Sequence, residues 1–164
     1  MMAVLIATSW LLLTAYIVYA VYLTGIPTSV SDTYYQLKKA NKPQWLFQIA
    51  MIIPAMLLLP AWLEVSRESL QFAAFLTCGA LMFVGAAPSF KLGLEGRVHY
   101  ISSLIAAGSS LVWLILSGVW LPFVIISVLS AVFCKKYGQP LFWAEIAAFA
   151  GTYAGVFCIY AERL

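Results

Sequence analysis

The chain alternates long apolar runs with short polar breaks, a pattern that predicts membrane-spanning helices. The six runs occupy residues 3–23, 45–63, 70–87, 98–116, 121–134 and 141–161. A transmembrane helix needs about 20 mostly apolar residues, and the fifth run is clearly shorter than that. We therefore expect a single all-α domain over residues 1–164, an integral membrane bundle of six transmembrane helices, or of five if the fifth run does not span. No Lys or Arg precedes the first run, so we expect it to be a retained helix rather than a secretory signal.

Two features interrupt this regular pattern. The most polar break, "SVSDTYYQLKKANKPQ" at residues 29–44, predicts a short helix over residues 33–40 that lies at the membrane interface, with Ser31 or Asp32 as its N-cap. Pro54 and Pro60 fall inside the second apolar run, which predicts a kink or a re-entrant break there.

Composition supports the membrane assignment and excludes other classes. Hydrophobic residues make up 64% of the chain and charged residues 9%, whereas a soluble domain carries roughly 25% charged residues. The net charge of +3 comes from basic residues scattered over loops, so no nucleic-acid partner is expected. Cys78, Cys134 and Cys158 lie in or beside apolar runs without metal-binding spacing, which indicates buried small side chains.

The basic residues also predict an orientation. Seven of the nine Lys and Arg residues lie on the first, third and fifth loops. Basic loops stay in the cytoplasm, so both termini of this multi-pass cell-membrane protein are expected outside. The loops expected in the cytoplasm are residues 25–44, 88–98 and 135–140. Asp32, His99 and Glu145 would then lie near the cytoplasmic face.

Glu145 is the most costly of these groups because it lies near the start of the sixth run. A charge at the bilayer centre costs about 2.5–3.5 kcal/mol, and less near the interface. A partner is therefore expected among Arg97, Lys135, Lys136 and His99. One alternative is a carboxylate paired with a loop lysine at the headgroups, and the other is a functional group.

His99, the single histidine of the chain, begins a stripe of small and weakly polar residues on the fourth helix. The positions within about 60° of His99 are Ser102, Ser103, Ala106, Ser110, Trp113 and Ser117. This stripe is typical of a packing seam with cross-helix hydrogen bonds, each worth about 0.6 kcal/mol. The alternative is the wall of a polar pocket or lipid-headgroup cleft with His99 at its mouth. The candidate binding residues are Arg97, Ser102, Ser103 and Ser110.

The sixth helix carries a second pattern. Ala147, Gly151 and Gly155 repeat every four residues and suit either a neighbouring helix or contact with a second copy of the chain. Aromatic residues near the predicted helix ends are expected to be interfacial anchors. They are Trp45, Trp62, Trp120, Trp143, Tyr22 and Tyr160.

These residues limit the possible chemistry. A metal site normally needs three or four ligands, and one histidine with a few acidic residues does not supply them, so no metal or cofactor is expected. The candidate catalytic residues are His99, Asp32 and Glu145. A serine–histidine–acid arrangement is open, with Ser31 or Ser102 as the nucleophile and Asp32 or Glu145 as the acid.

Two segments carry a resemblance to known proteins. The turn "PTSVSDTYY" after the first helix and "RVHY" at the start of the fourth resemble small bacterial multi-helix membrane families of unknown function, of the Frag/DRAM-like type. The resemblance implies five or six helices and favours Asp32 and His99 as a matched pair on one face. It implies no substrate.

Three functions remain open at this level. The first is a membrane protein that binds lipid or a membrane partner through the cytoplasm-facing polar cluster. The second is a lipid-modifying or lipid-hydrolysing enzyme that uses Asp32, His99 and Glu145. The third is a small transporter or channel subunit, with the stripe on the fourth helix lining the path.

Overall fold

The computed structural model describes residues 1–91 and 93–163, and this part of the chain is all-helical. Its helices are α1 (Met2–Thr24), α2 (Thr33–Lys39), α3 (Trp45–Val65), α4 (Glu68–Ala86), α5 (Gly93–Leu116), α6 (Trp120–Tyr137) and α7 (Pro140–Glu162). All but α2 are long and apolar enough to cross a membrane, which confirms the all-α fold and the multi-pass class. The fifth run was expected to be short, but α6 continues through its basic end to 18 residues, about 27 Å at 1.5 Å per residue. The six-helix version of the prediction is therefore the correct one.

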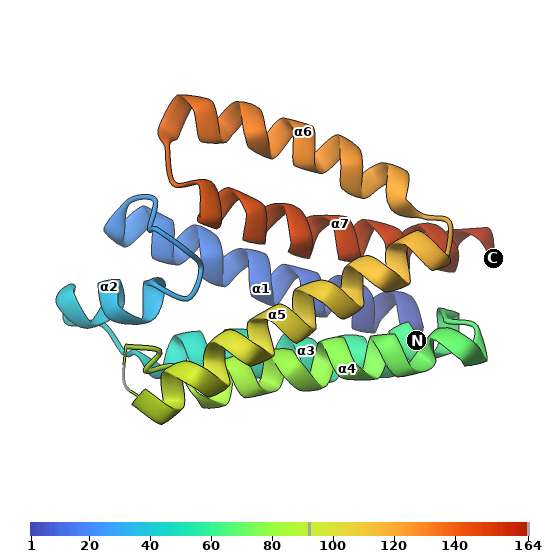
Figure 1. The fold of residues 1–164 in the computed structure, drawn as a ribbon, viewed down its shortest axis with the longest axis horizontal. Helices are drawn as coiled ribbons and strands as arrows, with labels where there is room; N and C mark the ends of the chain where they lie inside the picture. The colour runs from blue at the N-terminus through green and yellow to red at the C-terminus, as the bar shows by residue number, and fades with distance from the viewer. Residues whose placement is uncertain (92, 164) are drawn as a thin grey trace.

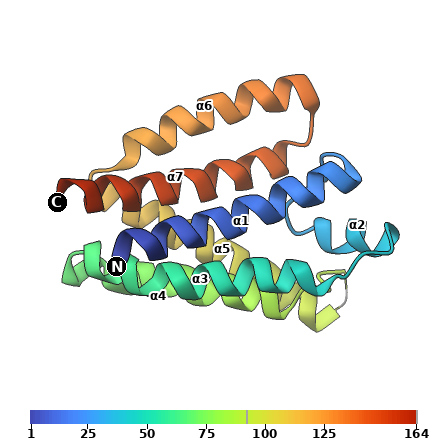
Figure 2. The same cartoon turned by 180° about the vertical axis from the view of Figure 1, so that it is seen from behind.

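The six long helices run antiparallel in chain order (Figure 1). α4 packs along both α3 and α5, and α1 packs on α3, while α6 lies outside the bundle against α7. Figure 2 shows from behind that α1 lies between α3 and α7. We call the loop end the end of the bundle that holds α2 and the α1–α3, α4–α5 and α6–α7 connections. Both chain termini lie at the opposite end, so the basic loops gather at the loop end as the sequence predicts.

The proline-containing helix is continuous, so the expectation of a re-entrant break is wrong. Pro54 and Pro60 both lie within α3. Ser9 of α1 donates to the Pro54 carbonyl at 2.7 Å, and the Tyr153 hydroxyl of α7 bonds to Ser9 in turn. This buried chain of bonds ties three helices together.

The start of α5 and the cap of α2 differ from expectation. α5 begins at Gly93, five residues before the predicted start, so the predicted loop over residues 88–98 is shorter. Gly96 makes this possible, because a Cβ there would lie 2.5 Å from the Phe90 carbonyl oxygen. Asp32 does precede α2, but its side chain makes no cap bond. Instead, the Asp32 amide donates to the Ser29 hydroxyl at 3.0 Å.

The small-residue pattern on α7 is used inside the chain. A Cβ on Gly151 would lie 2.5 Å from Cδ2 of Phe123 on α6, and one on Gly155 would collide with Leu114 of α5. Ala147 is also buried. These residues therefore seat neighbouring helices of the same chain, which is one of the two roles that the sequence left open.

One of the expected interfacial anchors is a core residue. Trp62 is fully buried and meets Trp113 edge to face at 5.2 Å between ring centroids. The Trp113 indole donates to Ser66 at 2.8 Å. α3 runs on to Val65 and packs against neighbours on both sides, so Trp62 faces the bundle interior rather than the headgroups. Trp45 and Trp120 are about half exposed, as interfacial anchors would be.

Candidate functional site

The loop between α1 and α2 folds inward and contacts two helices that are distant in sequence. The Val30 amide donates to Glu145 Oε2 on α7, and the Ser31 hydroxyl bonds to His99 Nε2 on α5 at 2.9 Å. Val30 is buried, and Ser31 is partly buried. Glu145 and His99, two of the three candidate catalytic residues, thus bond to neighbouring residues of one loop.

The bonds of His99 fix the orientation of its ring and the position of its proton. Nδ1 lies 2.9 Å from the Ala87 carbonyl oxygen. A carbonyl can only accept, so Nδ1 carries the proton in the neutral ring. Nε2 is then the acceptor for the Ser31 hydroxyl. This is the tautomer in which a histidine can take a proton from a serine.

Aromatic side chains enclose this histidine. The ring centroids of Phe90, Tyr100 and Phe47 lie 5.2, 6.1 and 6.4 Å from that of His99. His99 is only 3% exposed. The ring is therefore held by packing as well as by its two hydrogen bonds, and bulk water has little access to it.

Asp32 is buried near the same loop, but it has a different partner. Its Oδ2 accepts from Gln36 one turn along α2 at 2.9 Å. His99 instead bonds to Ser31 and Ala87. The matched pair of Asp32 and His99 that the resemblance implies is not formed, and Asp32 serves the turn that leads into α2.

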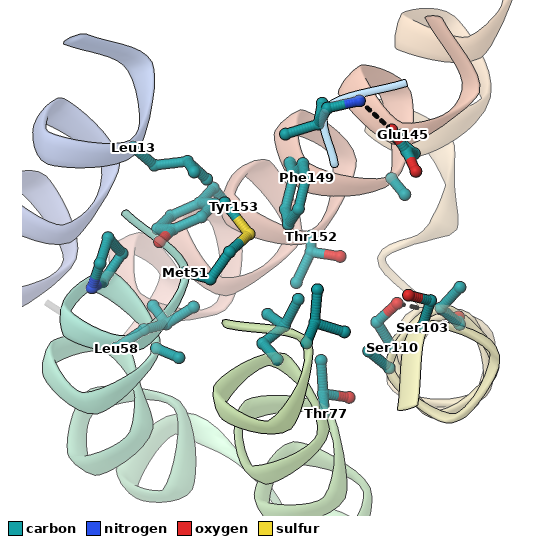
Figure 3. Close-up of a pocket in the computed structure, with 18 of the residues that line it drawn as sticks. Leu13, Met51, Leu58, Thr77, Ser103, Ser110, Glu145, Phe149, Thr152 and Tyr153 are labelled. Carbon is teal, nitrogen blue, oxygen red and sulfur yellow. Dashed lines mark hydrogen bonds between the residues drawn. The ribbon is translucent and has the colours of Figure 1, made fainter. Parts of the chain in front are cut away.

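A cavity of about 100 Å³ begins beside Ser31 and Glu145 and extends into the bundle. It lies between α1, α3, α4, α5 and α7 (Figure 3). Along α3 its wall reaches from Ala50 to Trp62, about 18 Å at 1.5 Å per residue. Its apolar lining includes Leu13, Met51, Leu58, Leu81, Val84 and Phe149.

The hydroxyl groups along this wall are mostly satisfied by their own helices. Ser103 donates to the His99 carbonyl at 2.8 Å, Ser110 to that of Ala107 at 3.0 Å, and Thr77 to that of Ala73 at 2.9 Å. These bonds leave most of the long wall apolar, and the Thr152 hydroxyl is a further polar group on it. Ser31 and Glu145 supply the polar groups at the loop end.

The predicted stripe on α5 lines the cavity only in part. Ser103 and Ser110 line the cavity, whereas Ser102 is buried outside the lining. The cross-helix bond comes from Ser109, whose hydroxyl lies 2.7 Å from that of Thr77 on α4. The sequence reasoning missed Ser109 because it faces α4 rather than the His99 side of the helix.

The basic partners expected for Glu145 are not its hydrogen-bond partners in the structure. Arg97 is exposed and does not line the cavity. Glu145 bonds to the Val30 amide rather than to a lysine, which corrects the expected headgroup ion pair. Oε2 of Glu145 makes the bond drawn in Figure 3, so Oε1 retains capacity to accept at the cavity end.

Part of the cavity lining reaches the molecular surface. Ala107 of α5 lines the cavity and is exposed, and Phe149 of α7 lines it and is partly exposed. α5 crosses α7 near its own C-terminal end and diverges from it toward the loop end (Figure 1).

Within residues 1–91 and 93–163, no cluster of three or more His, Cys, Asp or Glu side chains could hold a metal ion. Comparison with protein-family models, curated proteins and solved structures finds no match for this chain.

Proposed function

We propose that this protein binds a membrane lipid, with one acyl chain in the cavity and the polar part of the lipid at Ser31 and Glu145. The observation that carries the proposal is the division of the cavity into a long apolar wall and a short polar end. Ligand sites are typically apolar with a few well-placed polar groups that fix orientation. The exposed and partly exposed lining residues on α5 and α7 support entry from the bilayer.

The polar end suits the lipid atoms that lie just above an acyl chain. Oε1 of Glu145 can accept from a hydroxyl or an amine, and the Ser31 oxygen, whose own proton goes to His99, can accept from a hydroxyl as well. A transport path is less well supported, because the wall hydroxyls are bonded to their own helices and the far end meets the buried ring of Trp62.

We further propose that the loop end faces the cytoplasm. Basic loops are retained on that side of a membrane, and exposed lysines such as Lys38, Lys39 and Lys91 lie at this end. The bound lipid would then come from the cytoplasmic leaflet, which carries the anionic lipids that lysines attract.

Native mass spectrometry of the purified protein tests lipid binding. Ala148 lines the cavity one turn from Glu145, whereas Ala144 on the same helix is exposed. We expect the wild-type protein and Ala144→Phe to retain one lipid per chain, and Ala148→Phe to lose it because the ring fills the space. Equal retention by both variants, or no retained lipid in the wild-type protein, would refute the proposal.

A further inference from the structure

We propose that Ser31 and His99 form a nucleophile and general base that hydrolyse an ester bond of the lipid held in the cavity. This inference rests on the proposed lipid binding and goes beyond it by assigning a reaction. It is carried by the bond between the two side chains, by the tautomer of the histidine and by the position of Ser31 at the polar end of the cavity.

The pair has the geometry that serine activation requires. A general base must lie within about 2.6–3.2 Å of the oxygen whose proton it takes, and His99 Nε2 lies 2.9 Å from the Ser31 hydroxyl oxygen. A third group should orient the base, and the Ala87 carbonyl does this through Nδ1. A backbone carbonyl here takes the place of the carboxylate in a serine–histidine–acid triad.

The loop also offers one amide for a developing negative charge. The amides of Val30, Asp32, Thr33 and Tyr34 all donate to oxygens of the protein. Within residues 1–91 and 93–163, the Ser31 amide has no such partner. The amide of the nucleophile itself is one of the donors that stabilise the oxyanion in serine proteases, so we assign this role to the Ser31 amide.

The position of Ser31 selects the bond to be cut. Ser31 lines the cavity at the loop end, together with Glu145, and the apolar wall begins directly beyond these residues. The carbonyl carbon of an ester lipid lies at the junction between the acyl chain and the polar part. An acyl chain held by the apolar wall therefore brings its own ester group to Ser31.

The reaction balances with water as the second substrate. His99 Nε2 takes the Ser31 proton as the oxygen attacks the ester carbonyl carbon. The bond between that carbon and the alcohol oxygen then breaks, and the alcohol leaves with the proton from Nε2. Water next attacks the acyl-Ser31 carbon and gives a proton to Nε2, and Ser31 regains it as the free fatty acid departs.

Glu145 acts in this scheme as a positioning residue. Its bond to the Val30 amide holds the residue next to the nucleophile. Gln can still accept from that amide, whereas Leu cannot. We therefore expect Glu145→Gln to keep the reactivity of Ser31, and Glu145→Leu to lower it even where lipid is retained.

A fluorophosphonate probe tests the pair directly, because it labels activated serines without the need to know the lipid. We expect one adduct on Ser31 in the wild-type protein, none there in Ser31→Ala, and labelling about 100-fold slower or more in His99→Gln, since general bases contribute about 10²–10⁴-fold. Gln at position 99 can accept from Ser31 but cannot take its proton. Ser89, a partly exposed serine of the α4–α5 connection, is the matched control, and Ser89→Ala should leave the labelling unchanged.

The outcomes separate this inference from the proposed function. Unlabelled Ser31 in a wild-type protein that retains lipid would overturn the hydrolase and leave lipid binding intact. Equal labelling rates in the wild-type protein and His99→Gln would show that the bond to His99 only holds the loop, and would also overturn it. A wild-type protein that shows neither labelling of Ser31 nor bound lipid would overturn both proposals.

Discussion

Filling the cavity with Ala148→Phe should stabilise the lipid-free protein. An unfilled cavity costs about 24 cal/mol per Å³, so the cavity of about 100 Å³ costs about 2 kcal/mol when no lipid occupies it. In a chain of this size, 1 kcal/mol corresponds to about 2–4 °C in Tm. We therefore expect Tm to rise by about 4–8 °C if the ring fills most of the space.

The assay is thermal unfolding in amphipol, before and after lipid is returned. The wild-type protein should gain stability from lipid, because the acyl chain fills the same space that the ring fills in the variant. Ala148→Phe should gain little further. Ala144→Phe, which places the same ring on an exposed position of α7, should behave as the wild-type protein does.

Two results would refute this reasoning. A lower Tm in lipid-free Ala148→Phe would show that the ring overpacks the site, which typically costs 1–3 kcal/mol, and that the space is not available to a ligand. An equal lipid-dependent gain in the wild-type protein and Ala148→Phe would show that lipid acts on the outer surface rather than in the cavity.

Three further predictions concern the packing of the helices and the orientation of the protein in the membrane. Gly151→Ala should lower the free energy of unfolding by about 1–3 kcal/mol, because the added Cβ meets Phe123 of α6. A Cβ on Gly79 meets nothing within 4 Å, so Gly79→Ala should leave the free energy of unfolding unchanged or raise it by up to about 1 kcal/mol. Thermal unfolding compares the two variants, and equal effects would contradict the packing of α6 on α7. Arg163→Ala removes two bonds of 2.8 Å to the carbonyls at the C-terminal end of α3 and should cost about 1 kcal/mol or less at this exposed site, while Arg163→Lys should recover part of that loss. On a background without the native cysteines, Lys91→Cys should resist an impermeant thiol reagent added outside intact cells and Arg67→Cys should react; the reverse result would invert the orientation.

The location of the candidate residues at one end was predictable, whereas their pairing was not. Chain order places odd-numbered loops of a six-helix bundle on one side, so Asp32, His99 and Glu145 had to gather there. The partner of each residue depends on the path of the loop between α1 and α2. That loop brings the Val30 amide to Glu145 and the Ser31 hydroxyl to His99, while Asp32 turns back to Gln36.

The role of the stripe on α5 was predictable only in part. Helical spacing correctly placed Ser103 and Ser110 on the face of His99. Spacing alone cannot say whether such a face meets a neighbouring helix or a space, because that depends on where the other helices diverge. α5 and α7 separate toward the loop end, so part of the stripe lines a cavity. The same limit explains Trp62, which lies near a helix end in sequence and inside the bundle in space.

The amino-acid sequence alone predicted a membrane protein with five or six long helices and with Asp32, His99 and Glu145 at one end of the bundle. These properties follow from composition, run length and loop order, and all three are local or additive along the chain. The packing of the helices settles which carbonyl and which hydroxyl His99 bonds to, that Glu145 bonds to an amide rather than a lysine, and that a cavity opens beside Ser31 and Glu145. Such contacts join residues 68 and 115 positions apart, and they form only after the whole bundle has packed.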